Sequence, residues 1–338
     1  MGEDRISRYP KPVAPASYFF GADRLLETQP LIYRDLRGHF RRKTLSDSQR
    51  TNRHKLLLGT ASWGNRYGIL NSTHVQNDDV PKILKLALDA GIKGIDTAPG
   101  YGGSEVVLGC SDLRPFDVHT KIDSSTWARG SDAADAQFQA SIKSLGVSVV
   151  KGLTFHSAHA FLSSSFRALA FITRLRNEGF IKTWGISVYS PEEAYSVMRS
   201  ASPDYIQAPV NIVDRRFLNE MLVGRLLDAG IGLQARSIFL QGLLLSDEES
   251  LPIQFNELQP LISEYSVAAK ERGISQFELA LRFVNESTAV QGVVVGVNEE
   301  SHVQQLISST QEQFETLSLE GLSYSDKVEI IDPRSWRP

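Results

Sequence analysis

Four polar side chains in the middle of the chain combine the groups that a proton-transfer centre needs. Asp96, Tyr101, Lys121 and His156 supply a carboxylate, a phenol, an ammonium and an imidazole. Each falls at or just past the end of a short apolar run that is typical of a β-strand. If those strands belong to one sheet or barrel, the four side chains meet at its mouth and form a proton-donating centre.

Taken singly, each of these residues has an ordinary structural explanation. Asp96 could cap the turn after its strand, Tyr101 could be a half-buried core aromatic, and Lys121 could be solvated. His156 could be a hydrogen-bonded core histidine. Their joint placement favours chemistry, because Lys121 points by strand parity toward the crowded mouth, where an unpaired ammonium is costly. Asp96, on the neighbouring predicted strand, can supply the carboxylate that Lys121 needs.

The elements that would position these residues form a regular pattern from Lys55 onward. Short apolar runs alternate with longer amphipathic segments, and eight of the runs are predicted strands: 56–58, 92–95, 117–121, 149–155, 183–186, 205–207, 231–235 and 292–295. The segments between them have the periodicity of helices with one buried stripe. Two such stripes are Val80, Ile83, Leu84, Ala87 and Leu88, and Phe161, Leu162, Phe166, Leu169, Ile172 and Leu175.

Glycine marks the ends of four predicted helices. Gly91, Gly179, Gly230 and Gly273 stand where a left-handed cap is wanted, and each precedes an apolar residue that can cover the last helical turn. The first three glycines feed a predicted strand, and the fourth feeds another helix. This punctuation supports the alternation of strands and helices.

Strands that alternate with helices run parallel and need helices to cover them. A doubly wound sheet would be expected to show a G-x-G-x-x-G fingerprint after its first strand, but Gly59-Thr60-Ala61-Ser62-Trp63-Gly64 does not match it, and no P-loop occurs. Eight strand–helix units fit a closed α/β fold, the (β/α)8 TIM barrel of about 250 residues, whose active sites lie at the carboxyl ends of the strands. We therefore predict a barrel catalytic domain over residues 55–338.

Residues 1–54 differ in composition from the rest of the chain. Up to Lys55 there are twelve basic residues against six acidic ones, with no sustained helical or alternating period. We predict a basic, flexible N-terminal extension. Docking of this basic arm on a partner stays open as an alternative.

Composition limits the classes of partner. The 338 residues are 41% hydrophobic and carry a net charge of -3, which indicates a globular protein without the basic excess that recruits nucleic acid or anionic lipid. The one cysteine, Cys110, excludes an internal disulfide and fits a reducing compartment. No apolar stretch reaches the roughly 18 residues of a membrane span. The sequence predicts a cytoplasmic protein with a small-molecule partner and leaves its oligomeric state open.

One segment carries a specific family resemblance. Asp96-Thr97-Ala98-Pro99-Gly100-Tyr101-Gly102-Gly103-Ser104-Glu105 resembles the D-T-A-x-x-Y-G-x-S-E segment of aldo-keto reductases. Thr120-Lys121, His156, Gly185-Ile186-Ser187 and Ile206-Gln207 follow in the family's order, and the likeness covers roughly residues 56 to 306. It implies that Tyr101 is the general acid in carbonyl reduction and that Lys121 lowers its pKa. It also implies that Asp96 holds Lys121 and that His156 orients and polarises the carbonyl.

The resemblance also implies a nicotinamide cofactor, NADPH in the first place, because the sequence encodes no covalent hydride carrier. The residues that would bind it are Gly59, Thr60, Ser187, Gln207, Arg236, Ser237, Gly296, Asn298 and His302. The chain departs from the family pattern at Val188, where asparagine is frequent, and at Arg236, where many members stack a tyrosine on the nicotinamide. Glu299 and Glu300 stand where many NADPH-preferring members carry lysine and arginine, so NADH also stays open.

The sequence indicates less about the substrate than about the cofactor. Trp63, Tyr67 and Trp127 follow the first and third predicted strands, and aromatic walls suit an apolar aldehyde or the faces of a sugar ring. The segments 59–69 and 185–189 resemble a branch of the family associated with polysaccharide or sugar metabolism. No metal is expected, because His156 and His159 lack a third ligand at suitable spacing.

Two other functional classes stay open. A barrel that binds nicotinamide without turnover would act as a regulatory or scaffold subunit. A Schiff-base lyase would use Lys121 as its nucleophile. The intact set of four polar residues favours an enzyme that reduces an aldehyde or ketone over both alternatives.

Overall fold

The computed structural model describes residues 33–34, 40–41, 52–64, 75–246, 251–310 and 321–336. The chain divides into two compact units, residues 1–44 and 45–338. In the first unit, the described residues are two short antiparallel strands, β1 (Tyr33–Arg34) and β2 (Phe40–Arg41). Most of the predicted flexible extension lies outside the described residues, and its boundary after residue 54 stays a prediction.

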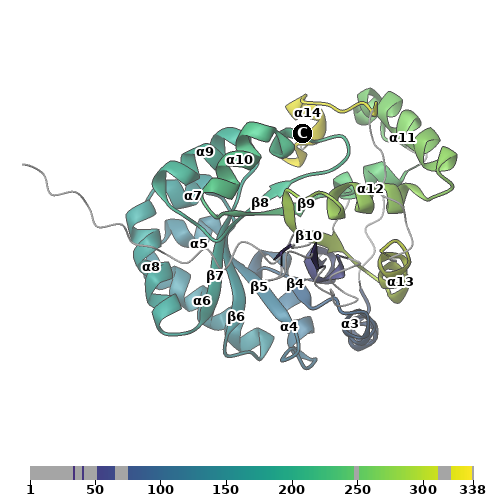
Figure 1. The fold of residues 1–338 in the computed structure, drawn as a ribbon. Coiled ribbons are helices and arrows are strands. Elements are labelled where there is room, and N and C mark those ends of the chain that lie inside the picture. Colours follow the sequence, from purple (N-terminus) through teal and green to yellow (C-terminus); the bar gives the residue numbers. More distant parts are fainter. Residues whose placement is uncertain are drawn as a thin grey trace, which may run out of the picture. The chain divides into compact units, whose positions relative to one another are not determined.

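The second unit is built around a closed barrel of eight parallel strands (Figure 1). In chain order these are β3 (Leu56–Gly59), β4 (Gly94–Asp96), β5 (Asp117–Ile122), β6 (Val150–Phe155), β7 (Ile181–Ser187), β8 (Tyr205–Pro209), β9 (Gly232–Arg236) and β10 (Val290–Gly296). Each strand pairs with the next, and β10 closes the barrel by pairing with β3. The predicted (β/α)8 architecture and all eight predicted strands are confirmed.

Helices surround the barrel (Figure 1). The longer ones are α3 (Val80–Asp89), α4 (Ser104–Gly109), α6 (Ser131–Leu145), α8 (Ser165–Asn177), α9 (Pro191–Ser200), α10 (Glu220–Asp228), α11 (Gln259–Glu271), α12 (Gln276–Asn285) and α13 (Glu300–Ser308). Short α-helices are α2 (Ala61–Gly64), α5 (Ser124–Ala128), α7 (Ala158–Leu162) and α14 (Val328–Ile331). Short 3-10 helices are η2 (Arg53–Lys55), η3 (Asn77–Asp79), η4 (Pro99–Tyr101), η5 (Arg216–Leu218), η6 (Leu240–Leu245), η8 (Ile253–Leu258) and η9 (Pro333–Ser335). Within the described part of the chain, none of the helices has both the length and the apolar character to cross a bilayer.

The left-handed glycines predicted at the ends of four helices are confirmed. Gly91, Gly179, Gly230 and Gly273 have φ angles of 81°, 81°, 66° and 65°. A side chain with a Cβ rarely adopts this left-handed conformation, so glycine ends each helix at low conformational cost.

The predicted stripe over residues 161–175 is wrong in one respect. This segment forms two helices, α7 and α8, that are separated at Ser163 and Ser164. Phe166 follows this break and is 88% exposed. The stripe of α8 that faces the core is instead made of Ala168, Phe171, Ile172 and Leu175. A single helical period drawn through the break therefore assigned Phe166 to the wrong face.

Candidate active site

A buried ion pair lies at the carboxyl ends of two adjacent strands. Asp96 ends β4 and Lys121 lies near the end of β5, and the two side chains are 2% and 1% exposed. Lys121 Nζ lies 2.6 Å from Asp96 Oδ2 and donates a second hydrogen bond to the carbonyl oxygen of Thr97 at 2.9 Å. Burial alone would lower the pKa of the Lys121 ammonium, but Asp96 and Tyr101 outweigh it and raise that pKa. The lysine is therefore held in its charged form.

Tyr101 is brought over this ion pair by the turn that follows β4. The helix η4 ends at Tyr101, and Gly102 then reverses the chain with a φ of 65°. The Lys121 ammonium lies 5.0 Å from the centroid of the phenol ring. Burial raises the pKa of Tyr101, and the positive charge of Lys121 opposes that rise. The influence of Lys121 thus has the direction implied by the family resemblance, although burial outweighs it.

His156 follows directly after β6, and its ring lies next to the ring of Tyr101. Its ring meets the ring of Tyr101 edge-on, with centroids 6.0 Å apart and planes at 80°. Its side chain is 32% exposed, whereas Lys121 is sealed beneath. The structure therefore brings together the four side chains that the sequence singled out, with the ion pair at the base and the imidazole open to solvent.

Two residues of this site had no place in the sequence prediction. Asp123 Oδ1 lies 3.4 Å from His156 Nδ1, and Asp123 is held in turn by Gln137 on α6. Burial favours a higher pKa for Asp123, but the hydrogen bonds from His156 and Gln137 and the nearby charges lower it overall. Strand parity could have indicated Asp123, because it lies two positions after Lys121 and so points to the same side.

Ser187, the last residue of β7, pairs in register with Gln207 in the middle of β8. Gln207 Nε2 donates to Asp96 Oδ1 at 2.9 Å and contacts Gln234 Oε1 at 3.4 Å. This amide therefore joins the ion pair to the wall of the barrel. Both Ser187 and Gln207 are buried, at 2% and 1% exposed.

The loop after β9 has an unusual backbone. Ser237, Leu240 and Gln241 have φ angles of 57°, 49° and 55°, three of the four positive values found for non-glycine residues in the described part of the chain. Asn211 Nδ2 donates to the carbonyl oxygen of Ser237 at 3.1 Å and helps to hold this loop. Strained backbone of this kind gathers at ligand sites, and such turns can direct successive N–H groups at an anion.

Arg236 ends β9 beside this loop. Its guanidinium stacks on the ring of Tyr189 at 4.1 Å and donates to the carbonyl oxygen of Val188 at 3.2 Å and to Ser237 Oγ at 3.3 Å. Arg334 lies 3.8 Å from the same ring. Within the described residues, the structure gives Arg236 no carboxylate partner.

The predicted adenosine-side residues gather where β10 meets α13. The backbone N–H of Asn298 donates to His302 Nδ1 at 3.1 Å, and Ser62 Oγ donates to Asn298 Oδ1. His302 Nε2 lies 3.5 Å from Glu299, and burial lowers the pKa of His302. Gly296 pairs with Gly59 in the barrel, and space is open above its Cα.

Thr60 is fully buried in a hydrogen-bonded cluster. Ser104 Oγ donates to Thr60 Oγ1 at 2.7 Å, and Thr60 Oγ1 donates to the carbonyl oxygen of Asp96 at 3.2 Å. On the same helix as Ser104, Glu105 accepts from Thr120 Oγ1 at 2.5 Å. These contacts anchor α4 and the Tyr101 turn to the barrel.

The predicted aromatic walls lie inside the protein. Trp63 is 0% exposed and donates from Nε1 to the carbonyl oxygen of Val297 at 2.6 Å. Trp127 is 1% exposed, packs edge-on against Phe155 and donates to Ser164 Oγ. Neither indole has a face open to a ligand, so their burial gives no support to the predicted substrate role. Tyr67 lies outside the described residues.

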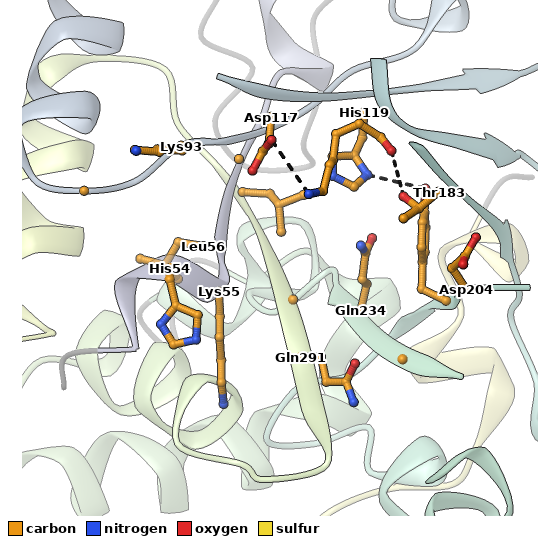
Figure 2. Close-up of a pocket in the computed structure, with 17 residues that line it drawn as sticks. His54, Lys55, Leu56, Lys93, Asp117, His119, Thr183, Asp204, Gln234 and Gln291 are labelled. Atoms are coloured by element: carbon orange, nitrogen blue, oxygen red, sulfur yellow. Dashed lines mark hydrogen bonds and ion pairs between the residues drawn. The ribbon is translucent and has the colours of Figure 1, made fainter. Parts of the chain in front are cut away.

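A second polar region lies at the opposite end of the barrel. A cavity of about 580 Å³ opens where the strands begin, and Figure 2 shows His119, Gln234 and Gln291 among its lining residues. His119 and Tyr205 meet there with ring centroids 5.7 Å apart. Among the residues described by the structure, no cluster of three or more histidine, cysteine or acidic side chains could hold a metal ion.

Comparison with protein families gives a match over most of the chain. The model of the aldo/keto reductase family matches residues 55–326. An aldo-keto reductase of Mycobacterium sp. (strain JLS) is 32% identical over 180 residues, which cover 50% of this chain and 62% of that protein. The NADH-specific methylglyoxal reductase of Escherichia coli (strain K12) is 29% identical over 178 residues, covering 46% and 54%. The matched region thus spans less than two thirds of the length of these curated relatives.

Solved structures show the same fold. An aldo/keto reductase from Klebsiella pneumoniae, in complex with NADP and acetate, superimposes with a TM-score of 0.61 at 21% identity over 79% of this chain and 88% of that one. The holo form of an aldo-keto reductase from Bacillus halodurans gives a TM-score of 0.62 at 20% identity, covering 78% and 88%.

Proposed function

The chain belongs to the aldo/keto reductase family, and from this premise we propose that it is an NAD(P)H-dependent enzyme that reduces an aldehyde or ketone to an alcohol. The observation that carries the proposal is the buried pair of Lys121 and Asp96, 2.6 Å apart, beneath the phenol of Tyr101. Reduction of a carbonyl builds negative charge on its oxygen, and a proton donor must meet that charge as it develops.

In this proposal each of the four residues has one task. Tyr101 donates its proton to the carbonyl oxygen, and the phenolate left behind is stabilised by the ammonium of Lys121. Asp96 keeps Lys121 charged and fixed. His156, whose side chain is 32% exposed, contacts the substrate from the solvent side. The arrangement stabilises the transition state more than the bound substrate, because the charge on the oxygen is largest during reaction.

The residues present fit a nicotinamide dinucleotide. Ser187 and Gln207 would hold the carboxamide, the strained loop from Ser237 to Gln241 would receive the pyrophosphate, and Asn298 would lie at the adenosine. When bound, the reduced nicotinamide supplies the hydride that accompanies the proton from Tyr101. The solved relative from Klebsiella holds NADP, and the Escherichia coli relative is NADH-specific.

NADPH is the first cofactor proposed, on family grounds, and NADH is its competitor. Glu299 and Glu300 stand at the start of α13, where they would oppose the charge of a 2′-phosphate. The direct comparison of the two cofactors therefore measures how much these acids matter. An aldehyde or ketone, with sugar-derived carbonyl compounds first, is the proposed substrate class.

The Schiff-base alternative is disfavoured by the state of Lys121. An amine must lose its proton to attack a carbonyl, but Asp96 holds Lys121 in its charged form with 1% of its surface exposed. A regulatory barrel without turnover would have no use for this buried ion pair beneath a phenol.

The test is titration of the purified protein with NADPH and with NADH, followed by steady-state assays on a panel of carbonyl compounds that includes sugar aldehydes. We expect tight binding of at least one reduced cofactor and its oxidation with a carbonyl compound. Binding without turnover on any carbonyl would favour the regulatory barrel, and trapping of a substrate on Lys121 by borohydride would favour the lyase.

A further inference from the structure

The side chain of Arg236 extends across the mouth of the barrel from the end of β9 to the end of β7. Strand β8 lies between these two strands. The guanidinium donates to the carbonyl oxygen of Val188, which directly follows Ser187, at 3.2 Å. The backbone N–H of Val188 donates in turn to the carbonyl oxygen of Gln207 at 3.0 Å. The guanidinium therefore lies beside the segment that carries Ser187 and Gln207, the two residues proposed to hold the nicotinamide carboxamide.

The ring of Tyr189 fixes this guanidinium in place. Arg236 Cζ lies 4.1 Å from the centroid of the ring, and Arg334 Cζ lies 3.8 Å from the same centroid. Two guanidinium groups this close would collide and repel each other on one face, so the ring is held between them. The backbone N–H of Tyr189 donates to Glu193 at 2.7 Å. Arg236 is therefore oriented before a ligand arrives.

The two arginines differ in how their charge is balanced. Arg334 pairs with Asp332 at 2.6 Å and lies 3.6 Å from Glu193. Arg236 donates to Ser237 Oγ and to a backbone carbonyl oxygen, and it pairs with none of the carboxylates that the structure describes. Arg334 thus holds the ring without adding net charge, whereas Arg236 adds a positive charge to the mouth of the barrel.

This charge reaches the proposed catalytic centre. Burial raises the pKa of Tyr101, and both Lys121 and Arg236 act against that rise. The charge of Lys121 is balanced by Asp96 at 2.6 Å. Asp123 follows β5, which lies four strands from β9 in the ring of eight and so on the opposite side of the barrel. Over the described ranges, Arg236 therefore acts on Tyr101 without a carboxylate beside it.

We propose that Arg236 makes the site discriminate between the two redox states of the nicotinamide cofactor, in favour of the reduced form. The nicotinamide ring is uncharged when reduced and carries one positive charge when oxidised. Hydride transfer requires this ring to lie against the carbonyl group that Tyr101 protonates. A fixed guanidinium at that place repels the oxidised ring and leaves the reduced ring unaffected.

The consequence is a preferred direction of loading. In a mixed pool of cofactor the site fills with the form that it binds more tightly. The reduced form loads the enzyme for reduction of a carbonyl compound, and the oxidised form leaves more readily after turnover. This inference rests on the proposed function for its cofactor, but it concerns binding and can be tested without a carbonyl compound.

The experiment is isothermal titration calorimetry of the purified protein with NADPH, NADP+, NADH and NAD+. Arg236→Gln removes the charge and keeps an amide that can donate to Val188. We expect the ratio of the Kd of the oxidised form to that of the reduced form to fall about tenfold in this variant, because only the oxidised ring was repelled. The fall should be the same for both cofactor pairs, since they share the ring and differ in the 2′-phosphate.

Two further variants separate charge from packing. Arg236→Lys keeps the positive charge without the planar stack on Tyr189, and it should keep most of the parent ratio. The matched control is Arg225→Gln. Arg225 on α10 lies 5.4 Å from the ring centroid of Tyr195 on α9, so this variant removes another guanidinium over a tyrosine, in the helical layer around the barrel. Its ratio should equal that of the parent.

The possible outcomes are distinct. Equal weakening of the oxidised and reduced forms in Arg236→Gln would make Arg236 a ligand of the cofactor phosphates and overturn the proposal. An unchanged ratio in Arg236→Gln, or the same fall in Arg236→Lys or Arg225→Gln, would overturn it as well. A parent protein that binds none of the four cofactors would instead overturn the proposed function, and with it the cofactor on which Arg236 is proposed to act.

Discussion

The two ends of the barrel each contain a tyrosine and a histidine in edge-on contact. At the carboxyl end, Tyr101 and His156 have ring centroids 6.0 Å apart with planes at 80°. At the opposite end, His119 and Tyr205 have centroids 5.7 Å apart with planes at 65°. The same two side chains in nearly the same geometry therefore occur in two surroundings of one fold.

The surroundings make the difference. Tyr101 stands over the ammonium of Lys121, whereas Tyr205 shares its hydroxyl with Thr154 at 2.7 Å and His119 at 3.4 Å. Burial lowers the pKa of His119 to about 4 and raises the pKa of Tyr205, so both groups stay neutral around pH 7. In the proposed function, the Tyr101–His156 pair differs from the His119–Tyr205 pair by the buried ion pair beneath it and by a histidine side chain that is 32% exposed.

The packing of His119 and Tyr205, called the lower pair, depends on glycine residues in the neighbouring strands. A Cβ on Gly152 would lie 2.2 Å from His119 Nδ1, and a Cβ on Gly185 would lie 2.2 Å from Tyr205 Cε2. Neighbouring strands therefore carry glycine where these two rings fill the barrel. This fits a structural role for His119 and Tyr205, because the two glycines leave the space that their buried rings fill.

The largest difference between the two ends of the barrel is expected in kcat when each phenol hydroxyl is removed in turn. Tyr101→Phe should lower kcat by roughly a hundredfold to ten-thousandfold, the usual contribution of a general acid, and leave cofactor affinity nearly unchanged. The matched variant Tyr205→Phe should keep kcat. Steady-state kinetics and cofactor titration of both variants give the measurement. Retained activity in Tyr101→Phe would remove that residue from the acid role.

The next largest effect is expected on stability at the ion pair. Lys121→Met leaves Asp96 buried without its partner, which should lower the free energy of unfolding by about 3–5 kcal/mol, measured by urea denaturation. The double variant Lys121→Met/Asp96→Asn should recover part of that loss but no activity. As a control at the other end, Lys151 pairs with Asp117 at 4.0 Å on the surface, and Lys151→Met should cost less than about 1 kcal/mol. Equal losses of unfolding free energy in Lys121→Met and Lys151→Met would contradict the difference between the two ends of the barrel.

The neutral histidine of the lower pair predicts a specific pH dependence. The pKa of His119 is about 4 in the folded protein against 6.5 for an ordinary histidine, so between these pH values the unfolded chain binds more protons. The contribution to stability is therefore fully present above pH 6.5 and is lost as the pH falls toward 4. The difference between these two pKa values corresponds to about 3 kcal/mol of unfolding free energy.

Urea denaturation of the parent protein and of His119→Gln across that range measures this contribution. The parent should lose stability more steeply than the variant as the pH falls below 6.5, whatever the stability of the variant at neutral pH. Parallel pH profiles would show that His119 is not held neutral by burial.

The same comparison shows which parts of the structure the sequence could predict. The strands and the site at their carboxyl ends, called the upper site, could be predicted from the sequence because local signals coincide. An apolar run ends, a polar residue follows it, and the order of the runs shows which strands are neighbours. Lys121 and Asp96 could be paired from strand parity and the cost of burying a charge. The positive φ angles of Gly91, Gly179, Gly230 and Gly273 could be predicted from the pattern of helix ends alone.

Contacts between distant elements were not accessible in this way. Gln137 clamps Asp123 from a separate helix, and no local period connects the two residues. Trp63 and Trp127 follow strands as residues at a barrel mouth do, yet both turn into the core, where Val297 and Ser164 accept their N–H groups. His119 lies inside a predicted strand, but its contact with Tyr205 depends on the closure of the barrel.

The smallest predicted effect concerns the hydrogen bond that completes the lower pair. Thr154→Val keeps the shape of the side chain and removes the hydroxyl that lies 2.7 Å from Tyr205 Oη. His119 Nδ1 still lies 3.4 Å from that oxygen, so the phenol keeps one partner and the cost should be only about 1 kcal/mol of unfolding free energy. Thr154 pairs in register with Lys121, the core of the upper site, yet kcat should not change. A loss of kcat in this variant would mean that the two ends of the barrel are coupled through β5 and β6.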